Sequence, residues 1–210
     1  MTWAVVLIKG FDAAKQRLSS ALDAPARAAL ARKNAARAIA AARPADHVLV
    51  VAGGDEPARL ARLSGVEVLL ESSPGGQNLA ASRGIQHAVE RGAGAVLLLS
   101  SDLPLVTPRA VRRFLRTAER LPAPAVLAAP AYGRGGTNAL YLRPPGAVSL
   151  HFGADSLALF RADASARGAD FRLYRSRTLA LDLDTPEDLA RLARLTSPAR
   201  GPRGAMVASA

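Results

Sequence analysis

The residues best suited to chemistry near the start of the chain are two lysines and an arginine that follow an apolar run. The run spans residues 3–8 and predicts a buried strand, and Lys9, Lys15 and Arg17 come soon after it. The chain holds 3 lysines against 25 arginines, so two ammonium groups in one short segment stand out. Open α/β sheets bind ligands at the carboxyl ends of their strands, and ammonium groups suit phosphate oxygens. The segment therefore predicts a nucleotide-phosphate site, with a solvated basic loop as the alternative; Gly10 would let the backbone approach a ligand closely.

A second candidate group is acidic. Asp102 follows an apolar run over 95–100, and the next helix does not need it as a cap because Thr107 already precedes Pro108 at that helix start. A carboxylate at the end of a central strand is well placed to hold Mg²⁺ against the phosphates of a nucleotide. The alternative is a structural role for Asp102 as a helix cap.

Two further carboxylates, Asp182 and Asp184, lie two residues apart at the end of a predicted strand over 178–183. Side chains two apart on a strand project to the same face, and neighbouring carboxylates repel each other unless a cation lies near them. The pair therefore predicts a divalent-ion site, with Asp182 as the better ligand. Alternatively, one of the two is exposed to solvent, and Asp184 supports the capping box that Thr185 and Asp188 would form.

Two later segments offer donors for an anion. Residues 133–138 contain three glycines whose backbone N–H groups could form an anion-binding concavity, with Arg134 and Thr137 as added donors, although a hairpin turn is the commoner explanation of such a run. Residues 152–156 open a predicted helix, whose N-terminus is a ready anion site, and Ser156 adds a hydroxyl donor.

A further polar candidate, Asn78, follows Gly76 and Gln77 at the beginning of a predicted helix. It is either the cap of that helix or a contact to a nucleotide base or ribose. The histidines are too far apart for metal-ligand spacing, so we interpret them as structural or surface residues.

The elements that must position these residues alternate between strands and helices. Apolar strand-like runs occur at 3–8, 47–52, 66–70, 95–100, 125–130, 138–142, 171–175 and 178–183. Helical patterns lie between them, at 25–42, 56–64, 78–91, 107–120, 154–167 and 185–195. The alternation predicts an α/β fold with a parallel sheet covered by helices on both faces, and the closer strands after residue 130 predict an antiparallel excursion.

Length and composition limit the kind of protein. The 210 residues predict a single domain over 1–195, followed by a disordered tail over 196–210, where breakers are frequent and periodicity is absent. The net charge of +11 could suit nucleic acid, but the arginines are scattered over helix faces and aromatic residues for base stacking are few, so we expect no nucleic-acid partner. No apolar run is long enough to span a bilayer, so we expect no membrane partner. Without cysteine or a signal peptide, the chain is expected in the cytoplasm.

These segments occur in the order found in the guanylyltransferases of coenzyme F-420 biosynthesis, the CofC/FbiD family, which the chain resembles from about Trp3 to Leu195. The pieces that carry the resemblance are Lys9 with Ala14–Leu18, Gly76–Asn78, Ser101–Pro104, Gly136–Leu140, Phe152–Ser156 and Leu181–Pro186. Many nucleotidyltransferases have Asp-Leu-Pro after a strand, whereas Gly-Thr-Asn, Phe-Gly-x-x-Ser and Asp-x-Asp-Thr-Pro in this order are fairly specific. The chain departs from the family pattern at Leu7-Ile8, Gln77 and Arg134.

The resemblance implies a fold and a reaction. The fold is a three-layer α/β/α, Rossmann-like nucleotidyltransferase of the glycosyltransferase-A type with a mostly parallel mixed sheet. The reaction is transfer of GMP from GTP to a small phosphorylated three-carbon acid, with release of pyrophosphate. Phosphoenolpyruvate, 2-phospho-L-lactate and 3-phosphoglycerate all carry a phosphate and a carboxylate within a few bonds, so the same donors could serve each. The product would pass to a downstream transferase.

The resemblance also implies roles for particular residues. The phospho-acid would be held by Thr137, Gly153 and Ser156, with Gly136 and Asn138 in the same Gly-Thr-Asn motif. Mg²⁺ would be held by Asp102, Asp182 and Asp184. The GTP phosphates would be held by Lys9, Lys15 and Arg17, with Asn78 also at the nucleotide.

Two other functions remain as alternatives. One is a related nucleotidyltransferase that acts on a sugar phosphate or a molybdenum cofactor, although the first loop lacks the Gly-Gly-x-Ser-x-Arg-Met-Gly pattern usual in those enzymes. The other is a basic nucleic-acid-binding or regulatory domain.

Overall fold

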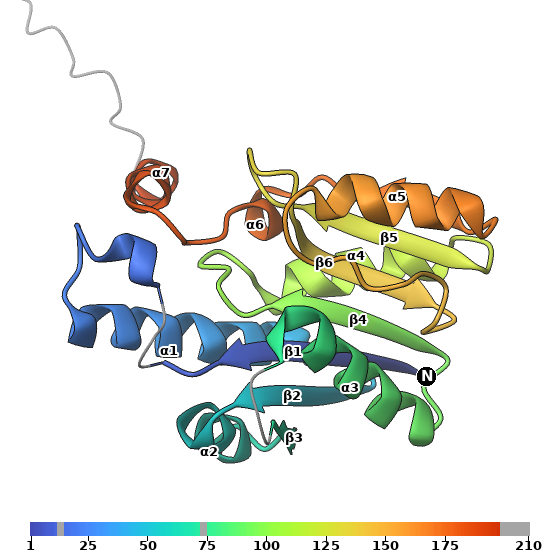
Figure 1. Ribbon diagram of the computed structural model, residues 1–210, viewed down its shortest axis with the longest axis horizontal. Coiled ribbons are helices and arrows are strands. Elements are labelled where there is room, and N and C mark those ends of the chain that lie inside the picture. Colours follow the sequence, from blue (N-terminus) through green and yellow to red (C-terminus); the bar gives the residue numbers. More distant parts are fainter. Residues whose placement is uncertain (12–14, 72–74, 198–210) are drawn as a thin grey trace, which may run out of the picture.

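A computed structural model describes residues 1–11, 15–71 and 75–197, and it contains a seven-stranded sheet with helices on both faces (Figure 1). The strands are β1 (Thr2–Lys9), β2 (His47–Gly53), β3 (Glu67–Leu70), β4 (Ala95–Ser100), β5 (Ala125–Pro130), β6 (Thr137–Arg143) and β7 (Asp170–Leu173). The helices are α1 (Ala24–Ala42), α2 (Asp55–Leu63), α3 (Gly76–Glu90), α4 (Pro108–Glu119), α5 (Ser156–Ala166), α6 (Arg177–Ala180) and α7 (Pro186–Thr196), with a 3-10 turn η1 (Gln16–Leu18). None of the described helices combines the length and the apolarity needed to cross a membrane. The predicted α/β fold class is confirmed.

The order of strands in the sheet is β3-β2-β1-β4-β6-β5-β7. All neighbouring strands pair in parallel except β6, which is antiparallel to both β4 and β5, so the predicted antiparallel excursion after residue 130 is confirmed. The chain builds β2 and β3 on one side of β1 and then crosses to place β4 on the other side. Ligands of open α/β sheets bind outside the carboxyl ends of the strands at such a switch point, which here lies between β1 and β4.

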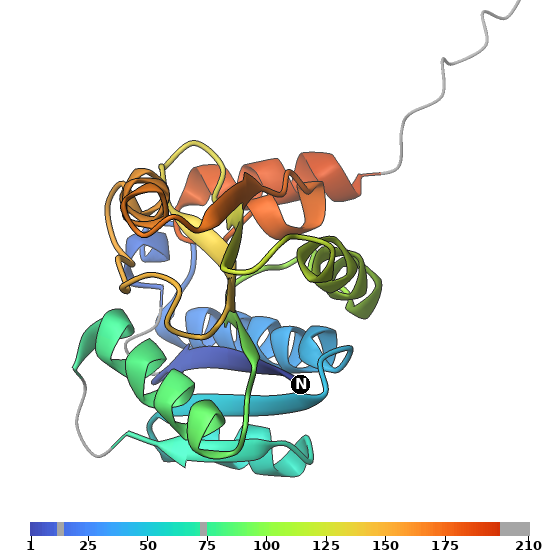
Figure 2. The ribbon, with the colours of Figure 1, turned by 90° about the vertical axis from the view of Figure 1, so that its right-hand side faces the viewer.

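The sheet is buried on both faces, so its strands are apolar in both directions. On β1, Val6 packs in the core formed with α1, α2, α4 and α6, whereas Val5 packs in the core formed with α3 and α5. Figure 2 shows α5 and α4 on opposite sides of the sheet. The face of α1 that meets the sheet is mostly alanine, including the buried Ala35 and Ala38, and these small side chains let the helix lie close to the strands.

The predicted strand over 178–183 is wrong. Residues 177–180 form the short helix α6, which buries Leu179, and residues 181–184 continue without strand pairing in the sheet. A short apolar run fits either a strand or a buried helical turn, and here the edge position beside β5 is taken by β7. The sequence predicts a boundary between domain and tail after residue 195, and the last helix, α7, ends at Thr196. Residues 198–210 of the predicted tail lie outside the described residues.

A single carboxylate fixes the loop that leads into α5. Asp163, on α5, accepts a hydrogen bond from the backbone N–H of Ser149 at 2.6 Å and another from Arg167 Nε at 2.7 Å, and His151 Nε2 lies 3.2 Å from it. The Ser149 N–H first, and then the Arg167 guanidinium, lower the pKa of Asp163 from 3.8 to about 2. The loop so fixed carries Gly153 toward the N-terminus of α5.

We expect the Asp163→Asn variant to be less stable at neutral pH, because the amide replaces a carboxylate that is stabilised in the folded state. The pKa is lowered on folding, so this stabilisation is complete above pH about 4 and is lost as the pH falls toward 2. Thermal unfolding of both proteins from pH 7 to pH 3 should show a difference of about 2–4 °C at pH 7 that narrows below pH about 4. A difference that stays constant over this range would contradict the assignment.

Candidate active site

The candidate residues gather where β1 and β4 end. Leu7 pairs with Ser100 in the parallel ladder of these strands, so the residues two positions further on, Lys9 and Asp102, leave the sheet beside each other. This is the switch point of the sheet. The basic group after β1 and the acidic group after β4, which the sequence predicts separately, therefore face the same space.

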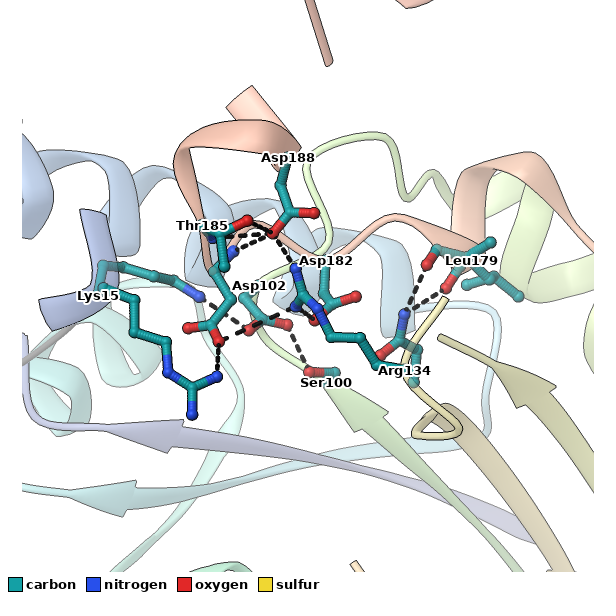
Figure 3. Close-up of polar contacts among 12 residues, drawn as sticks. Lys15, Ser100, Asp102, Arg134, Leu179, Asp182, Thr185 and Asp188 are labelled. Atoms are coloured by element: carbon teal, nitrogen blue, oxygen red, sulfur yellow. Dashed lines mark hydrogen bonds and ion pairs between the residues drawn. The ribbon is translucent and has the colours of Figure 1, made fainter. Parts of the chain in front are cut away.

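Lys15 and Asp102 form a direct ion pair (Figure 3). Lys15 Nζ lies 2.8 Å from Asp102 Oδ2, and Ser100 Oγ donates to the other carboxylate oxygen at 2.6 Å. Only 10% of the Lys15 side chain is exposed, and its backbone has a left-handed φ of 59°. Non-glycine residues adopt that conformation rarely, and strained residues of this kind cluster at functional sites. The fold therefore accepts a local cost to aim this ammonium group at the end of β4.

Two arginines engage the remaining predicted carboxylates. Arg17 Nη1 lies 2.9 Å from Asp184 Oδ2. Arg134 Nη1 lies 2.9 Å from Asp182 Oδ2 and 3.9 Å from Asp184 Oδ2. Arg134 also pairs with Asp188 at the start of α7, as Figure 3 shows. Positive and negative side chains from four separate segments thus alternate in one group. We call this group the ion-pair cluster; its members are Lys15, Arg17, Asp102, Arg134, Asp182, Asp184 and Asp188.

The segment that carries Asp182 and Asp184 is extended, although it is not a strand. Leu181 and Leu183 are buried while the two aspartates between and after them are partly exposed, so the predicted alternation of side chains holds. The N–H of Leu183 donates to the backbone carbonyl of Asp102 at 3.1 Å. This hydrogen bond ties the 181–184 segment to the end of β4.

The predicted helix caps are confirmed. Thr107 caps α4 with Pro108 at its start, and Thr185 and Asp188 form the capping box of α7. The Asp188 carboxylate also accepts from the backbone N–H of Asp184 at 3.0 Å. Asp188 is therefore shared between the helix cap and Arg134.

The pKa directions follow from this arrangement. Burial, and then the like charge of Asp102, raise the pKa of Asp182 above its usual value, although Arg134 opposes the shift. Burial opposes the charge of Arg134, but its hydrogen bond to Asp188 and the charges of the three nearby aspartates raise its pKa. Burial also opposes ionisation of Asp188, yet the N–H groups of Asp184 and Thr185 and the guanidinium of Arg134 hold its pKa below the usual value.

The carboxylates are suitable in type for a hard divalent cation. Asp102 and Asp182 come from different segments and lie near enough for the charge of one to shift the pKa of the other. Mg²⁺ and similar ions prefer such oxygen donors and complete their shell with phosphate oxygens and water. In the part of the chain that the structure describes, no group of three or more acidic, histidine or cysteine side chains is arranged to hold a metal by itself. Here these carboxylates are turned toward lysine and arginine, so the donor set fits a cation that arrives with a phosphate ligand.

A second group of predicted residues lies where the β5–β6 turn meets the N-terminus of α5. Ser156 Oγ donates to Thr137 Oγ1 at 3.1 Å, and both residues are buried. The N–H of Leu157 donates to the carbonyl of Gly135 at 3.0 Å, which joins the turn to the helix. Gly135 has a φ of 64°, a left-handed conformation that favours glycine, and a Cβ there would lie 3.1 Å from Asp155 Oδ1, so that carboxylate would have to shift by a few tenths of an ångström. The predicted hairpin turn is confirmed, and it places Thr137 and Ser156 in contact.

Two predicted asparagines make structural contacts. Asn138 donates its amide to the carbonyls of Leu179 at 2.9 Å and Ala180 at 3.1 Å, which holds α6 against β6. Asn78 exchanges two hydrogen bonds with the backbone of Phe152, at 2.8 and 3.1 Å. The alternative of Asn78 as a helix cap is wrong, because Gly75 occupies the N-cap position of α3. A direct role for either asparagine at a ligand stays a prediction.

The structure therefore divides the predicted residues into two neighbouring sets. Lys15, Arg17 and the three predicted metal ligands meet in the ion-pair cluster, and Lys9 lies beside it at the end of β1. Thr137 and Ser156 meet at the start of α5, with Gly136 and Gly153 in the segments that lead to them. Sequence reasoning did not foresee the contact of Ser100 with Asp102, or Arg134 as the link between the cluster and α7; the glycines around Arg134 were the available signal.

Comparison with known proteins gives a consistent result. The family model described as "Guanylyl transferase CofC like" matches residues 2–195. The chain is 41% identical over 192 residues to the phosphoenolpyruvate guanylyltransferase of Rubrobacter xylanophilus, with 90% of this chain and 92% of that protein covered. It is 34% identical to the 3-phospho-D-glycerate guanylyltransferase of Phenylobacterium zucineum (92% and 90% covered). It is 33% identical to the 2-phospho-L-lactate guanylyltransferase of Methanothermobacter thermautotrophicus (91% and 83% covered).

Solved structures are similar in fold. A protein from Desulfovibrio desulfuricans G20, assigned as a nucleotide-diphospho-sugar transferase, superposes with a TM-score of 0.74 at 18% identity and covers 97% of this chain and 91% of its own. The Rv0371C protein of Mycobacterium tuberculosis in complex with manganese superposes with a TM-score of 0.56 at 21% identity, covering 92% of this chain and 98% of its own. The predicted nucleotidyltransferase fold is confirmed.

We expect Arg134→Met to destabilise the protein, because it leaves Asp182 and Asp188 partly buried without their cation. The free energy of unfolding in urea should fall by about 1–3 kcal/mol, and adding Asp182→Asn should recover part of the loss. Arg17→Met is the matched control: the Arg17 side chain is 73% exposed, so loss of its ion pair should cost no more than about 0.5 kcal/mol. Equal losses from the two single variants would contradict the structural role of Arg134.

Proposed function

The chain belongs to the CofC-like guanylyl transferase family, and on that premise we propose that it transfers GMP from GTP to a small phosphorylated three-carbon acid, with release of pyrophosphate. The observation that carries the proposal is the meeting of cationic side chains and carboxylates at the β1–β4 switch point, together with the hydroxyl pair at the start of α5. Two ligands that both contain phosphate need such a two-part site. The family match over residues 2–195 supports one catalytic unit over 1–195.

The acid is one of the three on which the curated relatives act: phosphoenolpyruvate, 3-phospho-D-glycerate or 2-phospho-L-lactate. Phosphoenolpyruvate is the first candidate, because the Rubrobacter relative is the most similar of the three. The family supports a place in coenzyme F-420 biosynthesis, where a downstream transferase in the cytoplasm would consume the product.

The chemistry of the transfer requires no nucleophile from the protein. An anionic oxygen of the acid's phosphate attacks the α-phosphorus of GTP and forms the new P–O bond. The bond from that phosphorus to the oxygen bridging the β-phosphate breaks, and pyrophosphate leaves with the electron pair. The protein contributes position and charge, as in phosphoryl transfer generally.

The residues of the ion-pair cluster divide this work. Lys9, Lys15 and Arg17 neutralise the negative charge that grows on the departing pyrophosphate. To do so, Lys15 and Arg17 exchange Asp102 and Asp184 for phosphate oxygens, which frees the carboxylates. Asp102 and Asp182, with Asp184, would hold Mg²⁺, which when bound neutralises the reacting phosphates and orients them. Arg134 keeps the 181–184 segment in place while these partners exchange.

The hydroxyl pair serves the other substrate. Thr137 can donate to the phosphate of the acid, and Ser156 can do so by turning its hydroxyl away from Thr137; the N-terminus of α5 adds a favourable dipole for an anion. Gly136 and Gly153, the latter with a φ of 138°, leave the backbone bare beside them. Both reacting phosphates are then held by groups fixed to different strands.

The direct test is release of pyrophosphate with GTP, Mg²⁺ and each of the three acids in turn. We expect release that requires both GTP and one of the acids. Absence of release with all three acids would overturn the proposed function.

Asp102→Asn should abolish most turnover, because the amide is a poor ligand for a divalent cation. We expect kcat to fall at least about 100-fold, with circular dichroism unchanged. The matched control is Asp170→Asn, which removes a carboxylate paired with Arg172 on β7 and should leave kcat unchanged. Near-normal activity of Asp102→Asn would remove Asp102 from the metal site.

Thr137→Ala should weaken use of the acid more than use of GTP. Loss of one hydrogen bond to a charged phosphate should raise the apparent KM for the acid about tenfold while the KM for GTP changes little. Thr117→Ala is the control, because the Thr117 hydroxyl donates to the Arg113 carbonyl on the exposed side of α4. If the two KM values rise equally in Thr137→Ala, the residue does not belong to the acid subsite.

A further inference from the structure

Three residues, Lys9, Gly53 and Glu71, lie in one row across the carboxyl ends of β1, β2 and β3. Lys9 pairs with Gly53 in the β1–β2 ladder, and the N–H of Glu71 donates to the Ala52 carbonyl at 2.9 Å, which continues the β2–β3 ladder one residue beyond Leu70. Glu71 therefore lies opposite Gly53. Residues in one register row point to the same face of a sheet, so Lys9 and Glu71 share a face with the bare backbone of Gly53 between them.

The face is the one covered by α3. On β3, Glu67 pairs with His87 and Arg91 of α3, and Glu71 follows Glu67 by four residues, so it projects to the same side. Arg83, also on α3, lies 3.6 Å from Glu71 Oε1. The row thus runs from a phosphate-binding ammonium group to a carboxylate, two strand spacings or roughly 10 Å away.

The middle of the row carries no side chain, because Gly53 and the neighbouring Gly10 are glycines. The backbone conformation does not require glycine at either position. Neither Gly10 nor Gly53 has a positive φ. A Cβ on Gly53 would meet its nearest neighbour at 3.4 Å and one on Gly10 at 3.5 Å, which are ordinary contacts. Conformation and packing would both allow alanine at these positions, so the glycines leave a shelf open beside Lys9.

Glu71 is unusual for a carboxylate at the end of a strand. Its side chain is only 10% exposed, and Oε1 has no hydrogen-bond partner among the described residues. The Arg83 guanidinium, at 3.6 Å, forms an ion pair with Glu71 Oε1 but is too far for a hydrogen bond. A buried carboxylate oxygen without a donor is costly, and a ligand that brings N–H groups would remove that cost.

We propose that Glu71 recognises the guanine base of GTP. The base lies over the backbone of Gly53, and the two carboxylate oxygens of Glu71 accept hydrogen bonds from its N1–H and its 2-amino N–H. This inference rests on the proposed function and adds to it the residue that selects the base. Guanine carries these two donors side by side on one edge, and a carboxylate is an acceptor at both positions. Adenine presents an acceptor at N1, which the carboxylate repels. Asn78 is not available for this reading, since its amide is committed to Phe152.

The hydrogen bonds between Glu71 and the base predict how a substitution at this position changes the preference between guanine and xanthine. Xanthine keeps the N1–H donor but has a carbonyl in place of the 2-amino group, so a carboxylate opposes it. A glutamine side chain offers one acceptor and one donor, which match xanthine and mismatch guanine. Hypoxanthine, which lacks the 2-amino group, tests the second hydrogen bond alone.

The experiment compares kcat/KM for GTP, ITP, XTP and ATP in the unaltered protein and in Glu71→Gln, with the acid that supports turnover. The unaltered protein should prefer GTP to ITP by about tenfold or more and should reject XTP and ATP more strongly. In Glu71→Gln, the GTP value should fall about 100-fold and the XTP value should rise, so that the preference inverts. Glu67→Gln is the matched control, on the same strand and face and ion-paired with α3, and it should keep the preference for GTP.

The outcomes separate the two proposals. If no nucleotide releases pyrophosphate with any of the acids, the proposed function fails. If GTP is used but Glu71→Gln keeps the original preference for GTP over XTP, this inference is wrong and the Glu71–Arg83 pair is only structural. If Glu71→Gln does not fold, the unaltered protein decides: equal use of GTP and ITP overturns the inference, and a tenfold preference for GTP supports it.

Discussion

The parallel pairing of β1 with β4 is the constraint on which the rest of the site depends. The two strands are separated by about ninety residues of chain, yet their ladder brings Lys9 and Asp102 out of the sheet at the same edge. The later segments attach to this edge by specific bonds. Leu183 donates to the Asp102 carbonyl, Arg134 reaches from the β5–β6 turn to Asp182 and Asp188, and α5 is joined to the same turn through Gly135. A shift of one residue in the β1–β4 register would turn Lys9 and Asp102 toward opposite faces of the sheet, and the basic and acidic groups would no longer meet.

Charge balance explains why so many ionisable groups can share this small region. The chain carries a net charge of +11, and within the ion-pair cluster each carboxylate has a lysine or arginine as its neighbour. These contacts lower the free-energy cost of burying the Asp182 carboxylate near that of Asp102, and they fix the positions of the side chains. A nucleotide with its divalent cation presents the same two kinds of charge, so cations and carboxylates can change partners without a large change in net charge. That property suits a reaction whose demand is to neutralise and align two phosphates.

The sequence was a good guide wherever a local rule applied. Polar residues directly after apolar strands identified Lys9 and Asp102, cap residues identified Thr107 and Thr185, and the glycines before Thr137 identified a turn. Non-local contacts were out of reach. Nothing near Arg134 in the sequence reveals that it meets Asp188, and nothing near Asn78 reveals Phe152. The run over 178–183 was misjudged because a short apolar stretch fits a helical turn as well as a strand. The left-handed backbone at Lys15 is likewise not indicated by its residue type, because non-glycine residues adopt that conformation rarely.

In the proposed reaction, one site joins the α-phosphate of GTP to the phosphate of a small acid. Phosphorus-31 NMR of the reaction of GTP, Mg²⁺ and phosphoenolpyruvate tests this most directly, because it follows each phosphorus atom. We expect two mutually coupled signals of a diphosphate diester, one from each substrate, together with an equal amount of pyrophosphate. Formation of GMP or GDP with the signal of the acid unchanged would contradict it.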